Sequence, residues 1–71
     1  MSKKQLKSFG RKIRELRLDK ELTQQQFAEK INLSTNFVGM VERGERNTSL
    51  LKVFTMAKAL EVKPKELFDF D

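Results

Sequence analysis

The side chains best suited to specific chemistry lie close together in residues 35–43. Asn36 carries an amide and Arg43 a guanidinium, and each of these groups can form two hydrogen bonds to one partner. If the stretch is a helix with about 100° between residues, both side chains point away from the apolar positions Val38 and Val41. The flanking residues on that outer face are Thr35, Gly39 and Met40. The chemistry on offer is therefore hydrogen bonding to a ligand with several donors and acceptors.

The composition lacks the residue types that most often serve in catalysis and metal binding. The 71 residues include no histidine and no cysteine, which removes the usual general base, the Ser–His and Cys–His nucleophile pairs and the commonest zinc ligands. No glycine-rich phosphate loop is present, and disulfides cannot form. We therefore expect no enzymatic activity, no metal, no cofactor and no small-molecule ligand.

The formal net charge is +5, and its distribution along the chain is uneven. Residues 1–60 carry 13 basic and 6 acidic side chains, a balance of +7, whereas residues 61–71 carry 2 basic and 4 acidic ones, a balance of −2. A basic body indicates a polyanionic partner such as nucleic acid, although many small proteins are basic for solubility alone. The charge by itself leaves both interpretations open.

The length allows one domain with a modest core. Residues 1–71 contain no repeat, linker or low-complexity segment, so we expect a single domain over that range. The first four residues are followed by no apolar segment of the kind found in secretion signals, and no apolar run approaches the roughly 20 residues that span a bilayer. We therefore expect a cytoplasmic protein with no membrane partner.

Apolar spacing and capping residues predict five helices. The apolar positions of the first helix are Leu6, Phe9, Ile13 and Leu16, spaced three or four residues apart. A capping box is predicted where the second helix starts, with the Thr23 hydroxyl accepting from the Gln26 backbone while the Gln26 side chain bonds back. This helix should stop near Asn32, a residue that tolerates the left-handed conformation. Its inward residues are Phe27, Ala28 and Ile31.

The remaining helices are predicted from the same signals. Ser34 caps a third helix, and Gly44 is its natural C-terminal stop. Thr48 or Ser49 opens a fourth helix, because both residue types are good caps. Its expected inward face comprises Leu50, Val53, Phe54, Ala57 and Leu60. Pro64 suits the first turn of a short fifth helix, which contains Leu67 and Phe68.

The segment from Leu22 to Gly44 reads LTQQQFAEKINLSTNFVGMVERG and resembles the phage Cro and repressor-type (Xre) helix-turn-helix family. Ala28 falls where that family needs a small residue so that two helices can approach. Other matching positions are the core residues Ile31, Val38 and Val41 and the helix exit Glu42, Arg43 and Gly44. The resemblance implies an all-α, five-helix, lambda-repressor-like DNA-binding domain with its helix-turn-helix at residues 24–43.

The similarity extends from about Phe9 to Phe68 and so covers nearly the whole chain. One departure is Asn32, where the family usually has glycine in the turn. Asparagine also adopts a positive φ more readily than most residues. We therefore expect the turn geometry to be retained.

The resemblance implies a transcriptional regulator that binds double-stranded DNA in a sequence-specific way. It places the outer face of the third helix in the major groove, where every base pair presents a distinct pattern of donors and acceptors. Base readout is expected from Thr35, Asn36, Met40 and Arg43. Phosphate contacts are expected from Gln24, Arg46, Asn47 and Lys52.

Four more residues of this region receive structural roles. The positions of Arg17 and Glu42 pair with each other in family members, which would tie the first helix to the end of the third. Gly39 lies in mid-helix, where glycine costs about 1 kcal/mol relative to alanine, and we interpret it as allowing close approach to DNA. Phe37 lies at the edge of the core face and is predicted to pack.

A homodimer is expected because one such domain reads too few base pairs to find a genomic site. The C-terminal segment has more apolar surface than a short terminal helix needs, and its negative charge keeps it away from DNA. We predict that the operator is an inverted repeat and that the dimer interface contains Leu67, Phe68 and Phe70.

Two narrower interpretations stay open. The length and the loop from Glu42 to Asn47 are similar to those of the small controller proteins of restriction-modification systems, although many phage and plasmid regulators share this loop. From another functional class, the chain is also compatible with an antitoxin-type protein-interaction module whose DNA binding is secondary. A co-purifying protein partner would distinguish the second interpretation from the first.

Overall fold

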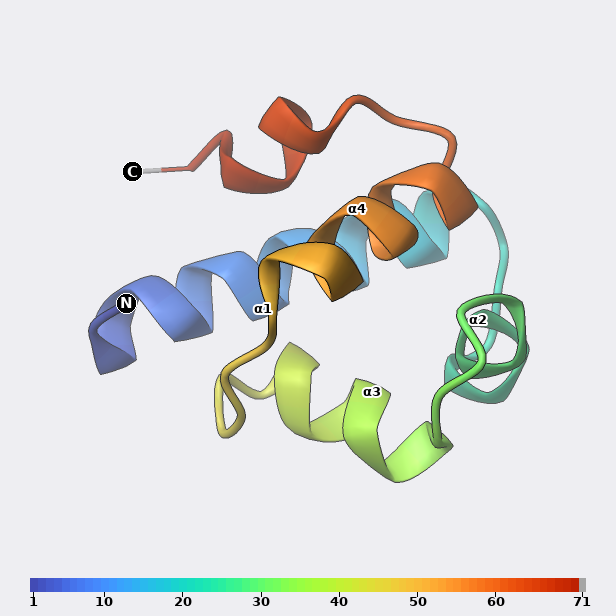
Figure 1. Cartoon of the computed structure of the whole chain (residues 1–71), viewed down its shortest axis with the longest axis horizontal. Coiled ribbons are helices and arrows are strands. Elements are labelled where there is room, and N and C mark those ends of the chain that lie inside the picture. Colours follow the sequence, from blue (N-terminus) through green and yellow to red (C-terminus); the bar gives the residue numbers. More distant parts are fainter. Residues whose placement is uncertain (71) are drawn as a thin grey trace.

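The computed structural model describes residues 1–70, which form four α-helices and one terminal 3-10 helix (Figure 1). The elements in chain order are α1 (Lys3–Asp19), α2 (Gln24–Lys30), α3 (Thr35–Glu42), α4 (Leu50–Ala59) and η1 (Pro64–Phe68). The expected all-helical fold is confirmed. The fifth helix differs from the prediction only in type, since this five-residue element adopts the tighter 3-10 winding common in short terminal pieces.

Each α-helix begins at a side chain that satisfies an otherwise free backbone N–H. The predicted box at the start of α2 is present, with the Thr23 hydroxyl 3.0 Å from the Gln26 nitrogen and the Gln26 side-chain oxygen 2.8 Å from the Thr23 nitrogen. Ser34 caps α3 in the predicted way. Of the two candidates for α4, Ser49 is the cap. Each such cap stabilises the fold by about 1 kcal/mol.

Every helix contributes to one core. Its buried members are Phe9, Ile13, Phe27, Ala28, Ile31, Val38, Val41, Val53, Met56, Ala57, Leu60 and Leu67. The inward residues predicted for α2 and α3 are therefore confirmed, as are Phe9 and Ile13 of α1, while Leu16 is half-buried against the core. None of the helices in residues 1–70 combines the length and apolar composition needed to cross a membrane.

The predicted inward face of α4 is wrong at two positions. Leu50 is 68% exposed and Phe54 is 50% exposed, whereas Met56 is fully buried. The core stripe follows the spacing Val53, Met56, Ala57 and Leu60. Phe54 lies about 100° around the helix from Val53 and so turns towards solvent, and its large apolar side chain gave a misleading signal in the sequence.

Figure 1 shows α3 along one edge of the molecule and η1 along the opposite edge, with α1 and α4 between them. Gly10 lets the end of α3 come close to α1, because a methyl group at this position would overlap the backbone oxygens of Val41 and Glu42. This close approach places the last turn of α3 on the side of α1, and leaves the other side of α3 facing solvent.

Candidate nucleic-acid interface

The turn between α2 and α3 has the predicted geometry. Asn32 adopts a φ of 57°, the left-handed conformation that ends many helices. The Leu33 nitrogen then donates to the Ala28 oxygen at 2.9 Å, and the Asn32 nitrogen donates to the Glu29 oxygen at 3.2 Å. These two bonds form a Schellman motif. Asparagine therefore serves in place of the usual glycine and directs the chain into α3.

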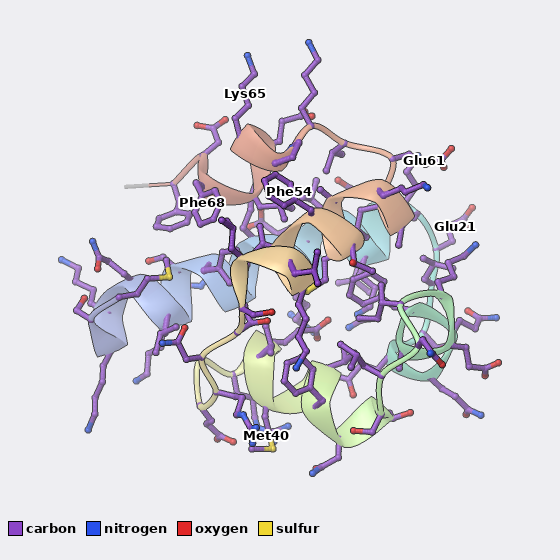
Figure 2. The ribbon with its side chains drawn as sticks, viewed as in Figure 1. Glu21, Met40, Phe54, Glu61, Lys65 and Phe68 are labelled. Carbon is purple, nitrogen blue, oxygen red and sulfur yellow. The ribbon has the colours of Figure 1, made fainter. Side chains whose placement is uncertain are left out.

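The four residues predicted to read bases share one face of α3. Thr35, Asn36 and Arg43 are exposed and Met40 is half-buried. The Asn36 amide nitrogen lies 3.5 Å from the Met40 sulfur, so these two side chains are neighbours. Figure 2 shows Met40 on the side of α3 that points away from the rest of the molecule. The structure thus brings the candidate readers together on a surface open to a ligand.

A buried ion pair holds the end of this helix. Arg17 of α1 donates to both carboxylate oxygens of Glu42, at 2.6 Å from Nε and 3.1 Å from Nη2, and the two side chains are only 8% and 2% exposed. The remaining guanidinium nitrogen donates to the Leu22 oxygen at 2.7 Å. This confirms the pairing that the resemblance implied. The network ties α3 to α1 and to the loop that precedes α2.

Gln24 belongs to the same network. Its amide nitrogen donates to Glu42 at 3.0 Å, and the residue is half-buried. A primary amide has two N–H groups, so one remains for a phosphate oxygen. Gln24 therefore stays a predicted phosphate contact, but its side chain is held in place by the protein.

Two of the other predicted phosphate contacts lie over the Phe37 ring. The Arg46 guanidinium lies 5.7 Å from the centre of the Phe37 ring and the Lys52 ammonium lies 4.8 Å from it. The ring itself packs against the core, as predicted. Asn47 uses its side-chain oxygen to accept from the Thr48 nitrogen at 2.9 Å, which leaves its amide N–H groups as donors. The cation–π contacts, which orient two long basic side chains, were not evident in the sequence.

Three residues next to this surface were overlooked in the sequence. A substituent on Gly44, whose φ is 74°, would come within 2.7 Å of the Lys7 Cα atom. Lys7 therefore lies beside the loop that follows α3. Gly10 could have been found, because a mid-helix glycine is costly, and that same signal identified Gly39. Glu45 contacts Arg43 at 3.1 Å. This contact could not be predicted from the sequence, because acidic residues are common in polar loops.

The predicted dimer residues are placed differently from expectation. Leu67 is fully buried, so its assignment to an interface is wrong. The 3-10 turn directs this side chain into the core of its own chain. Phe68 is 44% exposed with its ring centre 5.3 Å from that of Phe9, and Phe70 is half-buried against the core.

More apolar surface lies on α4 than at the C-terminus. Leu51 is 76% exposed, and Leu50 and Phe54 are also exposed. The expectation that the spare apolar surface lies in the C-terminal segment therefore misses its larger part, which is on α4. Together with Phe68, these side chains form what we call the α4 apolar face: Leu50, Leu51, Phe54 and Phe68.

Comparison with known proteins assigns the family. Residues 13–67 match the model of a helix-turn-helix family. The chain is 41% identical over 63 residues to control protein C.BamHI from Bacillus amyloliquefaciens, which covers 87% of this chain and 78% of that protein. It is 36% identical over 61 residues to control protein C.MunI from Mycoplasma sp, covering 84% of this chain and 82% of that protein.

The fold agrees with that of a solved relative. The restriction-modification controller protein C.AhdI from Aeromonas hydrophila superposes with a TM-score of 0.87 at 46% sequence identity, covering 89% of this chain and 96% of that one. The family match includes the whole of α2, the turn and α3, where the candidate readers lie. The chain therefore belongs to the helix-turn-helix family of Cro and repressor (Xre) type, whose members are DNA-binding transcriptional regulators, and it is closely related to restriction-modification control proteins.

Proposed function

We propose that this protein binds inverted-repeat operators as a homodimer, and thereby controls transcription of the genes of a restriction-modification system. The observation that carries this proposal is the exposed polar face of α3, held by the buried pair between Arg17 and Glu42. A helix presented in this way fits the major groove. The relation to control proteins from other restriction-modification systems supports the choice of target genes.

Each reader on α3 suits a particular base edge. The Asn36 amide can donate and accept at once, as adenine requires, and the Arg43 guanidinium can donate twice to guanine. Thr35 and Met40 offer apolar atoms to the methyl group of thymine. Sequence preference in this proposal comes from these four residues.

Phosphate contacts on both sides of α3 would set the position of that helix. Arg46 and Lys52 approach from the following loop and from α4, where Phe37 orients both cations. Gln24 and Asn47 would add neutral donors. Such contacts fix orientation and supply affinity, but they carry no sequence information themselves.

Self-association would use the α4 apolar face. Figure 2 shows Phe54 at α4 and Phe68 at η1, away from Met40 at the outer edge of α3, so a second copy could bind there without covering α3. Two recognition helices in successive major grooves need half-sites about 34 Å, or about 10 base pairs, apart. An inverted repeat follows because a two-fold dimer presents the same reader in opposite directions.

Selection of bound sequences from random duplex DNA tests the DNA-binding part. The expected product is an inverted repeat with half-site centres about 10 base pairs apart. Binding to it should weaken with salt at a log–log slope of about −0.9 for each neutralised phosphate. Enrichment of no common sequence, or an affinity insensitive to salt, would contradict the proposal.

Sedimentation of a Leu51→Glu variant tests the self-association part. A charge on the α4 apolar face should give a folded monomer, because Leu51 is exposed and adds little to the core. Leu18→Glu is the matched control, since Leu18 is an exposed leucine on α1. If Leu51→Glu sediments with the same assembly mass as the wild-type protein, the dimer interface must lie elsewhere.

A further inference from the structure

The Arg43 side chain lies over Gly39 on the outer face of α3. A methyl group at position 39 would lie 3.0 Å from Nη1 of Arg43 and 3.7 Å from the Gln24 side-chain oxygen. A separation of 3.0 Å is too short for an unstrained carbon–nitrogen contact. The absence of a side chain on Gly39 therefore leaves space for the guanidinium of Arg43. From the sequence we had instead interpreted this glycine as allowing close approach to DNA.

Glu45 holds the other side of the same guanidinium. Its Oε1 atom accepts from Nε of Arg43 at 3.1 Å. The backbone of Glu45 is placed by the end of α3, where its nitrogen donates to the Met40 oxygen at 2.8 Å. The Gly44 nitrogen donates to the Val41 oxygen at 3.0 Å, and Gly44 has a positive φ. This Schellman motif fixes the carboxylate relative to the last turn of the helix.

The two contacts restrict which atoms of Arg43 can meet a base. A guanidinium has one N–H on Nε and four on the two Nη atoms. Because Glu45 occupies the Nε donor, a guanine must be read end-on, with Nη1 and Nη2 donating to its O6 and N7 atoms. The side-on geometry would need Nε together with one Nη, and Nε already donates to Glu45.

We infer that Gly39 and Glu45 are positioning residues that set the base preference of Arg43 by holding its guanidinium end-on over the outer face of α3. This inference rests on the proposed function, because it requires Arg43 to read DNA. The Glu45 carboxylate also repels phosphates nearby. It therefore weakens binding to every sequence, and only a duplex that offers guanine to Arg43 compensates for that repulsion.

The test measures discrimination, defined as the ratio of Kd for a random duplex to Kd for the selected operator at one salt concentration. Glu45→Gln keeps the shape of the side chain and removes its charge, so binding to the random duplex should tighten while discrimination falls about three- to tenfold, part of the value of one bidentate base contact. The control is Glu29→Gln, which removes an exposed carboxylate from α2. Its discrimination should stay at the wild-type value.

Repeating both measurements in Arg43→Ala separates positioning from a general charge effect. If Glu45 acts through Arg43, Glu45→Gln changes discrimination in the wild-type background and leaves it unchanged in Arg43→Ala. Equal losses in the two backgrounds, or no loss in either, would overturn the inference. A wild-type protein without any preferred duplex would instead refute the proposed function, a different result from the same titrations.

Gly39→Ala supplies a variant whose folding is not in doubt. Alanine has the higher helix propensity, so the thermal midpoint should be unchanged or raised while the added methyl group shifts the guanidinium by a few tenths of an ångström. We expect a loss of discrimination no larger than that of Glu45→Gln. Wild-type discrimination in Gly39→Ala would show that the space over Gly39 has no role in reading.

Discussion

Two arginine–glutamate pairs meet at the end of α3, and they differ almost entirely in their surroundings. Glu42 pairs with Arg17 of α1, and the side chains are 8% and 2% exposed on the arginine and glutamate. Arg43, the next residue, pairs with Glu45, and these side chains are 55% and 56% exposed. Two ion pairs of the same composition, anchored at adjacent residues, therefore lie in very different dielectric environments.

The difference determines what each pair can do. A buried pair is desolvated, so removal of one partner leaves the other as an unpaired charge that water does not stabilise. An exposed pair keeps most of its hydration and contributes little to stability. The first pair can only hold the helices together, whereas the second uses only Nε of its arginine and leaves the Nη donors available to a ligand. Ionic strength should accordingly affect ligand binding more than the fold.

The largest expected effect is on stability when the buried pair is broken. Glu42→Ala should lower the free energy of unfolding by about 3–5 kcal/mol, because Arg17 remains charged and buried. Urea denaturation followed by circular dichroism measures this loss. The matched change Glu45→Ala should cost less than about 1 kcal/mol. Equal losses of unfolding free energy in Glu42→Ala and Glu45→Ala would contradict the distinction between a buried and an exposed pair.

Replacing both members of the buried pair should cost much less than replacing one. The double variant Arg17→Met with Glu42→Leu removes both charges together, and apolar replacement of a buried pair is often neutral or stabilising. Its free energy of unfolding, measured as for Glu42→Ala, should therefore exceed that of the single variant. A double variant less stable than Glu42→Ala would show that the hydrogen bond from Arg17 to Leu22, which the single variant retains, carries much of the stabilisation.

A smaller effect, on binding instead of folding, is expected for the exposed arginine. Arg43→Ala should weaken operator binding by about 1–3 kcal/mol and spare random DNA, with unfolding changed by less than about 1 kcal/mol. Fluorescence anisotropy with labelled duplexes measures both affinities. By contrast, Arg46→Ala should weaken binding to the operator and to the random duplex by similar factors. It should also reduce the magnitude of the log–log salt slope by about 0.9. A uniform loss for Arg43→Ala would make it a phosphate contact.

Asn36→Ala extends the same comparison to a neutral reader. Its amide should contribute about 1–3 kcal/mol to operator binding and nothing to random DNA. Because no charge is removed, the salt slope should stay at the wild-type value. Equal losses on both duplexes would remove Asn36 from the readers.

The smallest effect concerns a third pair, which is also exposed. Lys20 lies 3.0 Å from Glu61, and its hydrogen bond and positive charge hold the pKa of Glu61 below the ordinary value of 4.5. A lowered folded-state pKa stabilises the fold above the unfolded pKa, and this contribution is lost as pH falls through the folded pKa. Glu61→Gln should therefore be slightly less stable than wild type at pH 7. The difference should vanish in acid, and thermal melts at both pH values check this.

Local signals in the sequence were sufficient to predict the two helices of the helix-turn-helix, α2 and α3. Thr23 and Ser34 act on backbone groups three residues away, so their caps depend on nothing distant. Asn32 could be assigned to the turn because its positive φ is a property of that residue type. The outer face of α3 followed from helical periodicity, since Val38 and Val41 fix which side is inward.

Only the tertiary structure decided how strongly each residue is buried and which partner it meets. Phe54 and Met56 both fit an apolar stripe of α4, and the packing of the other helices selected Met56 for the core. Leu67 was expected at a surface, but η1 turns it inward. Glu42 and Arg43 are adjacent charged residues, and nothing in the sequence alone separates their degrees of burial. Their different roles arise because α1 approaches through Gly10 and buries one pair, while the other stays in water.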